Sequence, residues 1–129
     1  MARRNLWLVL AGLNGAAFVA LGAYGAHAPW GDSPLALRWF EVASRYHGWH
    51  ALALLAIALW AVEGRGARPR LRHGAAALFL AGTILFCGSL YRLAFVGAPL
   101  FAGAAPIGGA SFLLGWLALA AAGLVRRAV

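Results

Sequence analysis

The feature that most constrains this chain is a series of long stretches without a charged residue, at positions 6–26, 46–62, 74–91 and 93–125. A helix needs roughly 20 mostly apolar residues to cross the hydrocarbon core of a bilayer. The stretches do not alternate apolar and polar residues as barrel strands do, and open strands cannot span lipid. The sequence therefore predicts an all-α polytopic membrane protein, one domain over residues 1–129, with four transmembrane helices near 6–26, 46–63, 74–97 and 107–125.

Composition agrees with this architecture. Hydrophobic residues make up 64% of the chain and charged residues 11%, whereas a soluble domain has about 45–50% and about 25%. These values exclude a soluble globular enzyme and a disordered chain. The single cysteine, Cys87, excludes an internal disulfide framework, and we expect it to pack as a small apolar residue.

The first stretch also resembles a secretory signal peptide. Arg3 and Arg4 precede it, and residues 26–28 imitate a small-residue cleavage site. However, its apolar run exceeds the roughly 7–15 residues of a signal core, and Pro29 would follow the scissile bond. We therefore expect a retained helix.

The positions of the arginines predict the orientation. The chain has eleven basic residues, all arginine, and a net charge of +8. Arginine-rich short loops mark the cytoplasmic side of a membrane. We therefore expect both termini in the cytoplasm of a bacterial inner membrane, with loops 27–45 and 98–106 outside. The basic side is expected to attract anionic lipid headgroups. Nucleic acid is not an expected partner, because the charge is divided among helix ends. Eight arginines lie on the predicted inner side: Arg3, Arg4, Arg65, Arg68, Arg70, Arg72, Arg126 and Arg127.

The outer loop before the second predicted transmembrane helix carries a helix signal of its own. Asp32, Ser33 and Pro34 are typical of a capped helix start with proline at the first position. Downstream, apolar residues share one helical face, while charged residues share another. The pattern predicts a short interfacial amphipathic helix between the first two transmembrane helices.

Small residues predict how the helices pack, because close helix approach in lipid depends on them. The predicted packing positions include Gly15, Gly22, Gly88, Gly108 and Gly115. An alternative is that glycine, present 17 times, is simply abundant. The full stripes are Gly12, Gly15, Gly22 and Ala26; Gly74, Ala77, Ala81 and Gly88; and Gly108, Ser111, Gly115, Ala118 and Ala122.

The predicted topology places several polar residues, which lipid disfavours, at a similar depth in the outer leaflet of the membrane. These residues are the candidate binding residues. An arginine within a membrane segment indicates function by default, although Arg92 lies shallow enough to reach the surface. Asn14, in the middle of the first helix, is expected to hydrogen-bond to another helix. The expected outer polar layer comprises His27, Glu41, His47, His50, Ser89, Tyr91 and Arg92.

The three histidines also suggest a metal site. His27, His47 and His50 could supply three ligands, with water as the fourth, as in catalytic zinc sites. The spacing is weak support, and Arg92 adds unfavourable positive charge. We therefore predict no metal, and the sequence identifies no cofactor.

Several segments, taken in order, resemble a known family. They are Gly22 to His27, Tyr46 to Leu55, Phe86 to Tyr91, Pro106 to Gly109 and Phe112 to Trp116. They are similar to the domain of unknown function 423 family, the YgdD-type small inner-membrane proteins, with eukaryotic transmembrane protein 256 as a relative. The resemblance implies a four-helix membrane protein and no established activity. It also implies that His47 is replaceable by Gln and that Arg92 is not fixed, which favours His27 and His50.

Together these patterns predict a non-enzymatic membrane protein that binds a lipid-soluble ligand or a partner helix through the outer polar layer. An accessory subunit of a membrane complex or a homo-oligomer is equally consistent. The alternative is a proton or small-molecule transporter, or a metal-dependent membrane enzyme, using His27 and His50. A third interpretation is that the polar groups only hold the helices together.

Overall fold

The computed structural model describes residues 5–63 and 68–124, and all regular elements in these ranges are helical. The elements are α1 (Leu6–His27), α2 (Pro34–Val62), α3 (Pro69–Gly82), the π-helix η1 (Thr83–Cys87), α4 (Gly88–Val96) and α5 (Ala104–Gly123). Because α3, η1 and α4 follow without a break, Pro69–Val96 is one helix of 28 residues. The all-α prediction is confirmed. Five of the arginines on which the predicted orientation depends lie outside the described residues: Arg3, Arg4, Arg65, Arg126 and Arg127.

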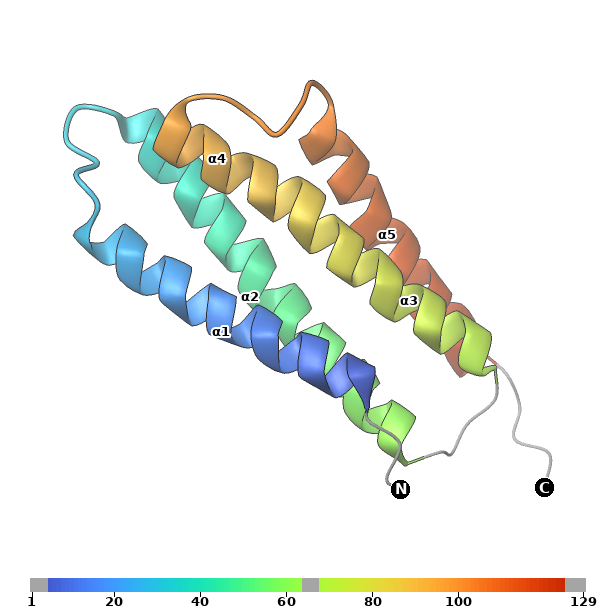
Figure 1. Ribbon diagram of the computed structural model, residues 1–129. Helices are drawn as coiled ribbons and strands as arrows, with labels where there is room; N and C mark the ends of the chain where they lie inside the picture. Colours follow the sequence, from blue (N-terminus) through green and yellow to red (C-terminus); the bar gives the residue numbers. More distant parts are fainter. Residues whose placement is uncertain (1–4, 64–67, 125–129) are drawn as a thin grey trace.

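The four helical rods pack side by side, with α2 and the α3–η1–α4 rod in the middle (Figure 1). The first helix packs mainly on α2, and α5 packs mainly on α3 and η1. The start of α1 and the end of α5 lie at the same end of the molecule, while the α1–α2 and α4–α5 loops lie at the opposite end (Figure 1). Sequential rods therefore run antiparallel.

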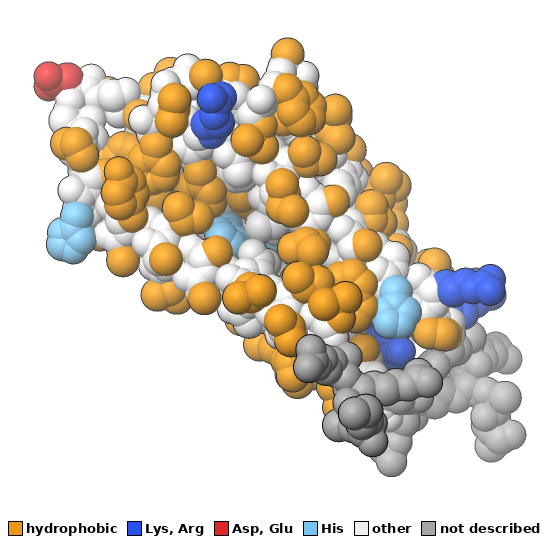
Figure 2. All heavy atoms as spheres, viewed as in Figure 1, with side chains coloured by type: hydrophobic (Ala, Val, Ile, Leu, Met, Phe, Trp, Pro, Cys, Tyr) orange, Lys and Arg blue, Asp and Glu red, His pale blue; other side chains and the backbone are white. Residues whose placement is uncertain are grey.

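Three helices are long and apolar enough to cross a membrane: α1, the Pro69–Val96 helix and α5. The remaining rod, α2, carries Arg38, Glu41 and Arg45 in its first half and is not among these three. Hydrophobic side chains cover much of the face visible in Figure 2, and basic side chains gather mainly near its ends. Such a surface is suited to lipid rather than to water.

The second helix begins earlier than the predicted transmembrane helix near 46–63. Its predicted cap is present, since Ser33 Oγ accepts a hydrogen bond from the Ala36 amide at 3.3 Å and Pro34 occupies the first helical turn. However, residues 34–45 are not a separate interfacial helix. They continue into the rest of α2 without interruption, because no proline or glycine breaks the chain before Gly48.

The start of the third rod differs from the prediction as well. The helix begins at Pro69 rather than near Gly74, after Arg68 with a left-handed φ of 63°. Arg70 and Arg72, expected in a connecting loop, are therefore helical. Arg72 is buried, and its guanidinium lies 5.3 Å from the centre of the Trp60 ring. The cation–π contact with this aromatic neighbour offsets part of the cost of burying the arginine.

Close packing is concentrated between α5 and the preceding rod. A Cβ at Gly108 would overlap the backbone of Phe86, and one at Gly115 would lie 2.7 Å from the Phe79 ring. Ser111 Oγ donates a 2.7 Å hydrogen bond to the Leu78 carbonyl. At Gly88 the nearest atom, on the Leu100 side chain, is an ordinary 3.4 Å away.

The glycines of the predicted stripe on α1 make no close contact with the other helices. Nothing lies within 4 Å of a Cβ built at Gly15 or Gly22. The buried residues of α1 are instead Ala11, Asn14 and Gly25. The stripe fails because helix contact here pairs a large ring with one glycine, as Phe40 does with Gly25, rather than two small-residue stripes.

Candidate functional site

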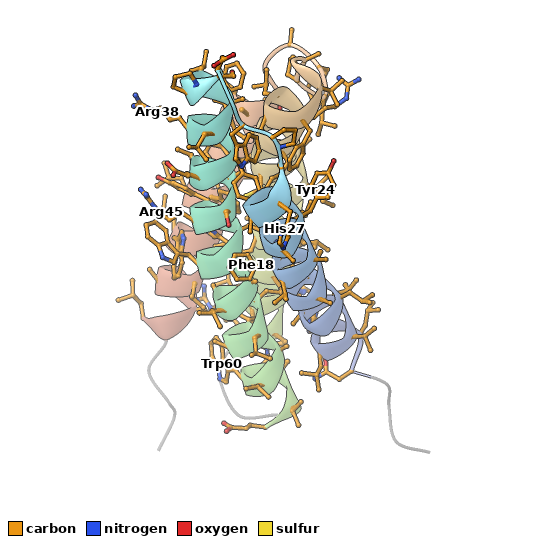
Figure 3. The ribbon with its side chains drawn as sticks, turned by 90° about the vertical axis from the view of Figure 1, so that its left-hand side faces the viewer. Phe18, Tyr24, His27, Arg38, Arg45 and Trp60 are labelled. Atoms are coloured by element: carbon orange, nitrogen blue, oxygen red, sulfur yellow. The ribbon has the colours of Figure 1, made fainter. Side chains whose placement is uncertain are left out.

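A groove of about 850 Å³ lies between α1 and α2. Two residues of its lining, Phe18 and Arg45, are labelled in Figure 3. Its α2 wall extends from Phe40 to Leu55. At 1.5 Å per residue this wall is about 22 Å long. The lining residues are Ala11, Gly15, Phe18, Val19, Phe40, Glu41, Ser44, Arg45, Gly48, Trp49, Ala51, Leu52 and Leu55.

Polar groups occupy only one end of this groove. Glu41, Ser44 and Arg45 lie within two turns of α2 near the α1–α2 loop, and the α2 residues of the lining beyond Arg45 carry no charge. Glu41 and Arg45 are exposed and stand one helical turn apart, a spacing at which side chains share a face. The groove thus has a charged head region and an apolar remainder. A lipid molecule has the same arrangement, with a polar headgroup at one end and an apolar chain beyond it.

A buried polar cluster lies behind the groove. His47 Nε2 and Asn14 Oδ1 are 2.8 Å apart, and His47 Nδ1 and Tyr91 Oη are 3.0 Å apart. Because the Asn14 oxygen only accepts, Nε2 donates to it and Nδ1 accepts from the tyrosine hydroxyl. The cluster therefore joins α1, α2 and α4 through one imidazole. Phe18, labelled in Figure 3, packs edge-on to His47 with ring centres 5.5 Å apart and also lines the groove.

His50 belongs to a second polar pair. Its Nε2 accepts a 3.0 Å hydrogen bond from Trp116 Nε1, and its Nδ1 lies 2.7 Å from the Tyr46 carbonyl oxygen. Because an indole can only donate, the proton of the imidazole sits on Nδ1 and is donated to that carbonyl. The ring also stacks on Phe112, with centres 3.6 Å apart. Both ring nitrogens are thus engaged, and α2 is tied to α5.

The other expected polar residues do not join these groups. Arg92 is exposed and donates from Nη1 to the carbonyl oxygens of Ala98 and Pro99 in the α4–α5 loop. Ser89 is buried, and its Oγ accepts from the Leu100 amide at 3.4 Å. The predicted single polar layer is therefore divided into local contacts. His47 with Tyr91 is the one pair of predicted site residues that the structure brings into hydrogen-bond contact.

The alternative that uses His27 together with His50 is not supported. His27 ends α1 and is exposed on the side facing the viewer in Figure 3. Gly25 contacts Phe40, and His50 lies ten residues further along α2, a rise of about 15 Å. Within residues 5–63 and 68–124, no three His, Cys, Asp or Glu side chains are grouped to hold a metal ion. The described residues therefore do not bring His27, His47 and His50 together as a set of metal ligands.

Several residues that the sequence patterns did not single out take part in these sites or in the Arg72–Trp60 contact described above. Phe18, Ser44 and Trp116 are aromatic or small residues, common in any membrane helix, so no signal distinguishes them. Arg72 offered a signal, because an arginine three residues after Pro69 lies inside a proline-initiated helix rather than in a loop.

Comparison with known proteins identifies relatives. The model of the family "Protein of unknown function (DUF423)" matches residues 21–109. The chain is 39% identical to the UPF0382 membrane protein of Haemophilus influenzae, over 91% of this chain and 92% of that protein. It is 39% identical to the UPF0382 inner membrane protein YgdD of Escherichia coli K12, over 92% and 88%.

A more distant relative extends the comparison. The UPF0382 membrane protein YwdK of Bacillus subtilis is 32% identical, over 92% of this chain and 95% of that protein. No solved structure matches. The family model covers most of the chain and the relatives nearly all of it, which confirms the resemblance found in the sequence. The chain therefore belongs to the DUF423 family of membrane proteins.

Proposed function

We propose that this protein is a non-enzymatic integral protein of the bacterial inner membrane that binds one lipid-soluble amphiphile in the α1–α2 groove. The observation that carries the proposal is the groove's polarity: a charged head region at Glu41, Ser44 and Arg45, then a wall without charge down to Leu55. The inner-membrane name of the Escherichia coli relative supports the location.

The mode of binding follows from this geometry. The apolar chain of the ligand lies along Gly15, Val19 and Leu52, where it replaces membrane lipid. The polar head lies between the two charged side chains, where Arg45 donates to a phosphate or carbonyl oxygen and Glu41 accepts from an ammonium or hydroxyl group. The outer polar layer expected from the sequence is thus replaced by the groove's head region, with Glu41 common to both.

The membrane arrangement is part of the same proposal. All four rods cross the bilayer, and α2 does so because its charges face the groove head and its own helix end rather than the hydrocarbon. Both termini face the cytoplasm, in keeping with the arginine distribution. A reporter fused to the C-terminus tests this orientation: activity of a periplasmic reporter at that site contradicts it.

The ligand experiment uses photoactivatable phosphatidylethanolamine in vesicles containing the full chain, with crosslinks mapped to residues. Wild-type protein should crosslink along α1 and α2 within the groove. Gly15→Leu should reduce this labelling several-fold, because Gly15 lines the groove and has open space for a side chain. Gly12→Leu is the matched control, since it is also unobstructed but does not line the groove.

A second pair of variants tests the head region. Arg45→Gln should weaken groove labelling, whereas Arg38→Gln should not, because Arg38 lies on the same helix but does not line the groove. Equal labelling of both glycine variants and both arginine variants would show that lipid contacts the surface without a site. Crosslinks to another protein in place of lipid would contradict the proposal and favour an accessory-subunit role.

A further inference from the structure

A separate cavity of about 530 Å³ lies at the other end of the molecule, where α1 begins, α2 ends and α3 begins. It does not depend on the α1–α2 groove and shares no lining residue with it. Its walls are Asn5, Leu6, Trp7, Ala61, Val62, Arg72 and His73. In a membrane crossed by these helices, helix ends lie near the headgroups.

Arg72 is the unusual member of this wall. Only 8% of its surface is exposed, and its buried Nε has no hydrogen-bond partner among residues 5–63 and 68–124. The guanidinium rests over Trp60, a contact that uses the face of the cation and leaves its N–H edges available. Glu63, the acidic residue at this end, is exposed and does not line the cavity. A buried arginine at membrane depth normally has an anionic or polar partner.

His73 adds a defined donor to the same wall. Trp7 Nε1 donates a 2.6 Å hydrogen bond to His73 Nδ1, and the two rings are stacked. Because that nitrogen accepts, the proton of the neutral imidazole is on Nε2, which can donate. Arg72 also stands in the first turns of α3, where the helix dipole is positive and attracts anions.

Other groups at the cavity hold its shape rather than compete for a ligand. Asn5 Oδ1 caps α1 by accepting from the Leu8 amide, and its Nδ2 donates to the Ala58 carbonyl at 3.2 Å. The amide is therefore already paired on both sides. Among the described residues, the cavity thus combines a buried cation, an imidazole N–H without a hydrogen-bond partner and a helix N-terminus. If the four rods cross the bilayer as proposed above, the cavity lies near the lipid phosphates.

From this combination we infer that the cavity binds the phosphate group of an anionic phospholipid, held by the Arg72 guanidinium and His73 Nε2. Arginine pairs well with phosphate because two of its N–H groups match two phosphate oxygens. The acyl chains extend from the cavity into the surrounding leaflet. The site is built for one lipid molecule, in contrast to the diffuse attraction that exposed arginines exert on a negatively charged surface.

The test compares two arginines of one helix. Native mass spectrometry of the full chain in mild detergent measures binding of phosphatidylglycerol and phosphatidylcholine. Wild type should prefer phosphatidylglycerol, and Arg72→Gln should lower that preference at least about tenfold, as expected for a buried charge-assisted contact. Arg70→Gln is the matched control, because Arg70 is helical but exposed and should change binding by about fivefold or less.

Further measurements keep the inference falsifiable. Arg72→Lys retains the charge and should retain part of the preference, and circular dichroism of all variants verifies that they remain folded. Excess inorganic phosphate distinguishes two sources of the anion: failure to displace the lipid supports a membrane-held headgroup, and displacement overturns it in favour of a free phosphate site. Equal losses in the Arg70 and Arg72 variants, or none in either, overturn the inference.

Discussion

The contact between α5 and η1 at Gly108 allows a sharp stability prediction. Gly108 and Gly109 are adjacent on α5, but only the first faces the neighbouring backbone. A Cβ at Gly108 would lie 2.8 Å from Phe86 Cα and closer to its nitrogen, whereas one at Gly109 would lie 3.8 Å from the Phe86 ring. Since carbon atoms pack best at about 3.5–4.0 Å, α5 would have to move by about 1 Å to accept Gly108→Ala.

The two alanine variants share the gain in helix propensity that follows from replacing glycine. Each gains about 0.8–1.0 kcal/mol of helix propensity, so this term cancels in their difference. Gly108→Ala additionally forces a backbone shift, and overpacking of this kind costs typically 1–3 kcal/mol. We therefore expect Gly108→Ala to be less stable than Gly109→Ala by about 1–3 kcal/mol.

The assay is unfolding of purified protein in detergent, by heat or by titration with a denaturing detergent, followed by circular dichroism. Gly109→Ala should equal or exceed wild type. Gly108→Ala should unfold first of the three. If the two variants unfold at the same point, the tight α5–η1 contact does not exist in the folded protein and the packing argument is refuted.

Three further predictions concern buried polar groups and the thiol. Trp116→Phe should destabilise the protein by about 1–3 kcal/mol, because His50 Nε2 loses its donor while buried; the same unfolding assay measures it. Asn14→Leu should cost only about 0.6 kcal/mol, the average for polar contacts between membrane helices, because the lost His47 contact is offset by removal of the buried Asn14 Nδ2, which has no hydrogen-bond partner among the described residues. Cys87, 1% exposed, should resist maleimide in the folded protein and react after denaturation.

Two of these predictions have a control variant, and the third has a defined contradicting result. Trp49→Phe removes an indole that is part of a 56% exposed residue and should leave stability within about 0.5 kcal/mol of wild type. Gly12→Cys places a thiol in open space and should react at once, so slow labelling there would show that the reagent is excluded by detergent. A loss of several kcal/mol for Asn14→Leu would contradict its assignment as a modest interhelical contact.

The features of the fold that could be predicted depend on local sequence or on the thickness of the bilayer. Charge-free stretches revealed four helical rods, and the Ser33–Pro34 pair revealed the start of α2. The face of α5 that carries Gly108, Ser111 and Gly115 is the face that the structure buries. There the small residues recur at steps of three and four, and the neighbouring rod supplies the large rings.

Other features depend on contacts that no spacing encodes. On α3 the buried face carries Phe79 and Gly82 rather than the predicted alanines, because Phe79 packs against Gly115 and Phe112 packs against Gly82. Whether α3 or α5 supplies the large ring at a given contact depends on both helices together, so the sequence of one helix does not predict it. The candidates for the predicted polar layer have different partners for a related reason: His47 contacts α1 and α4, whereas His50 contacts α5.

The hydrogen bond between His50 and Trp116 has a consequence for synthesis in the membrane. The two residues are 66 positions apart, so the helix that carries the imidazole is made well before the helix that carries the indole. Until α5 arrives, the accepting nitrogen of His50 has no partner in an apolar surrounding, which is costly. A nascent or truncated chain without α5 thus carries an unpaired polar group, and the arrival of the last helix removes it.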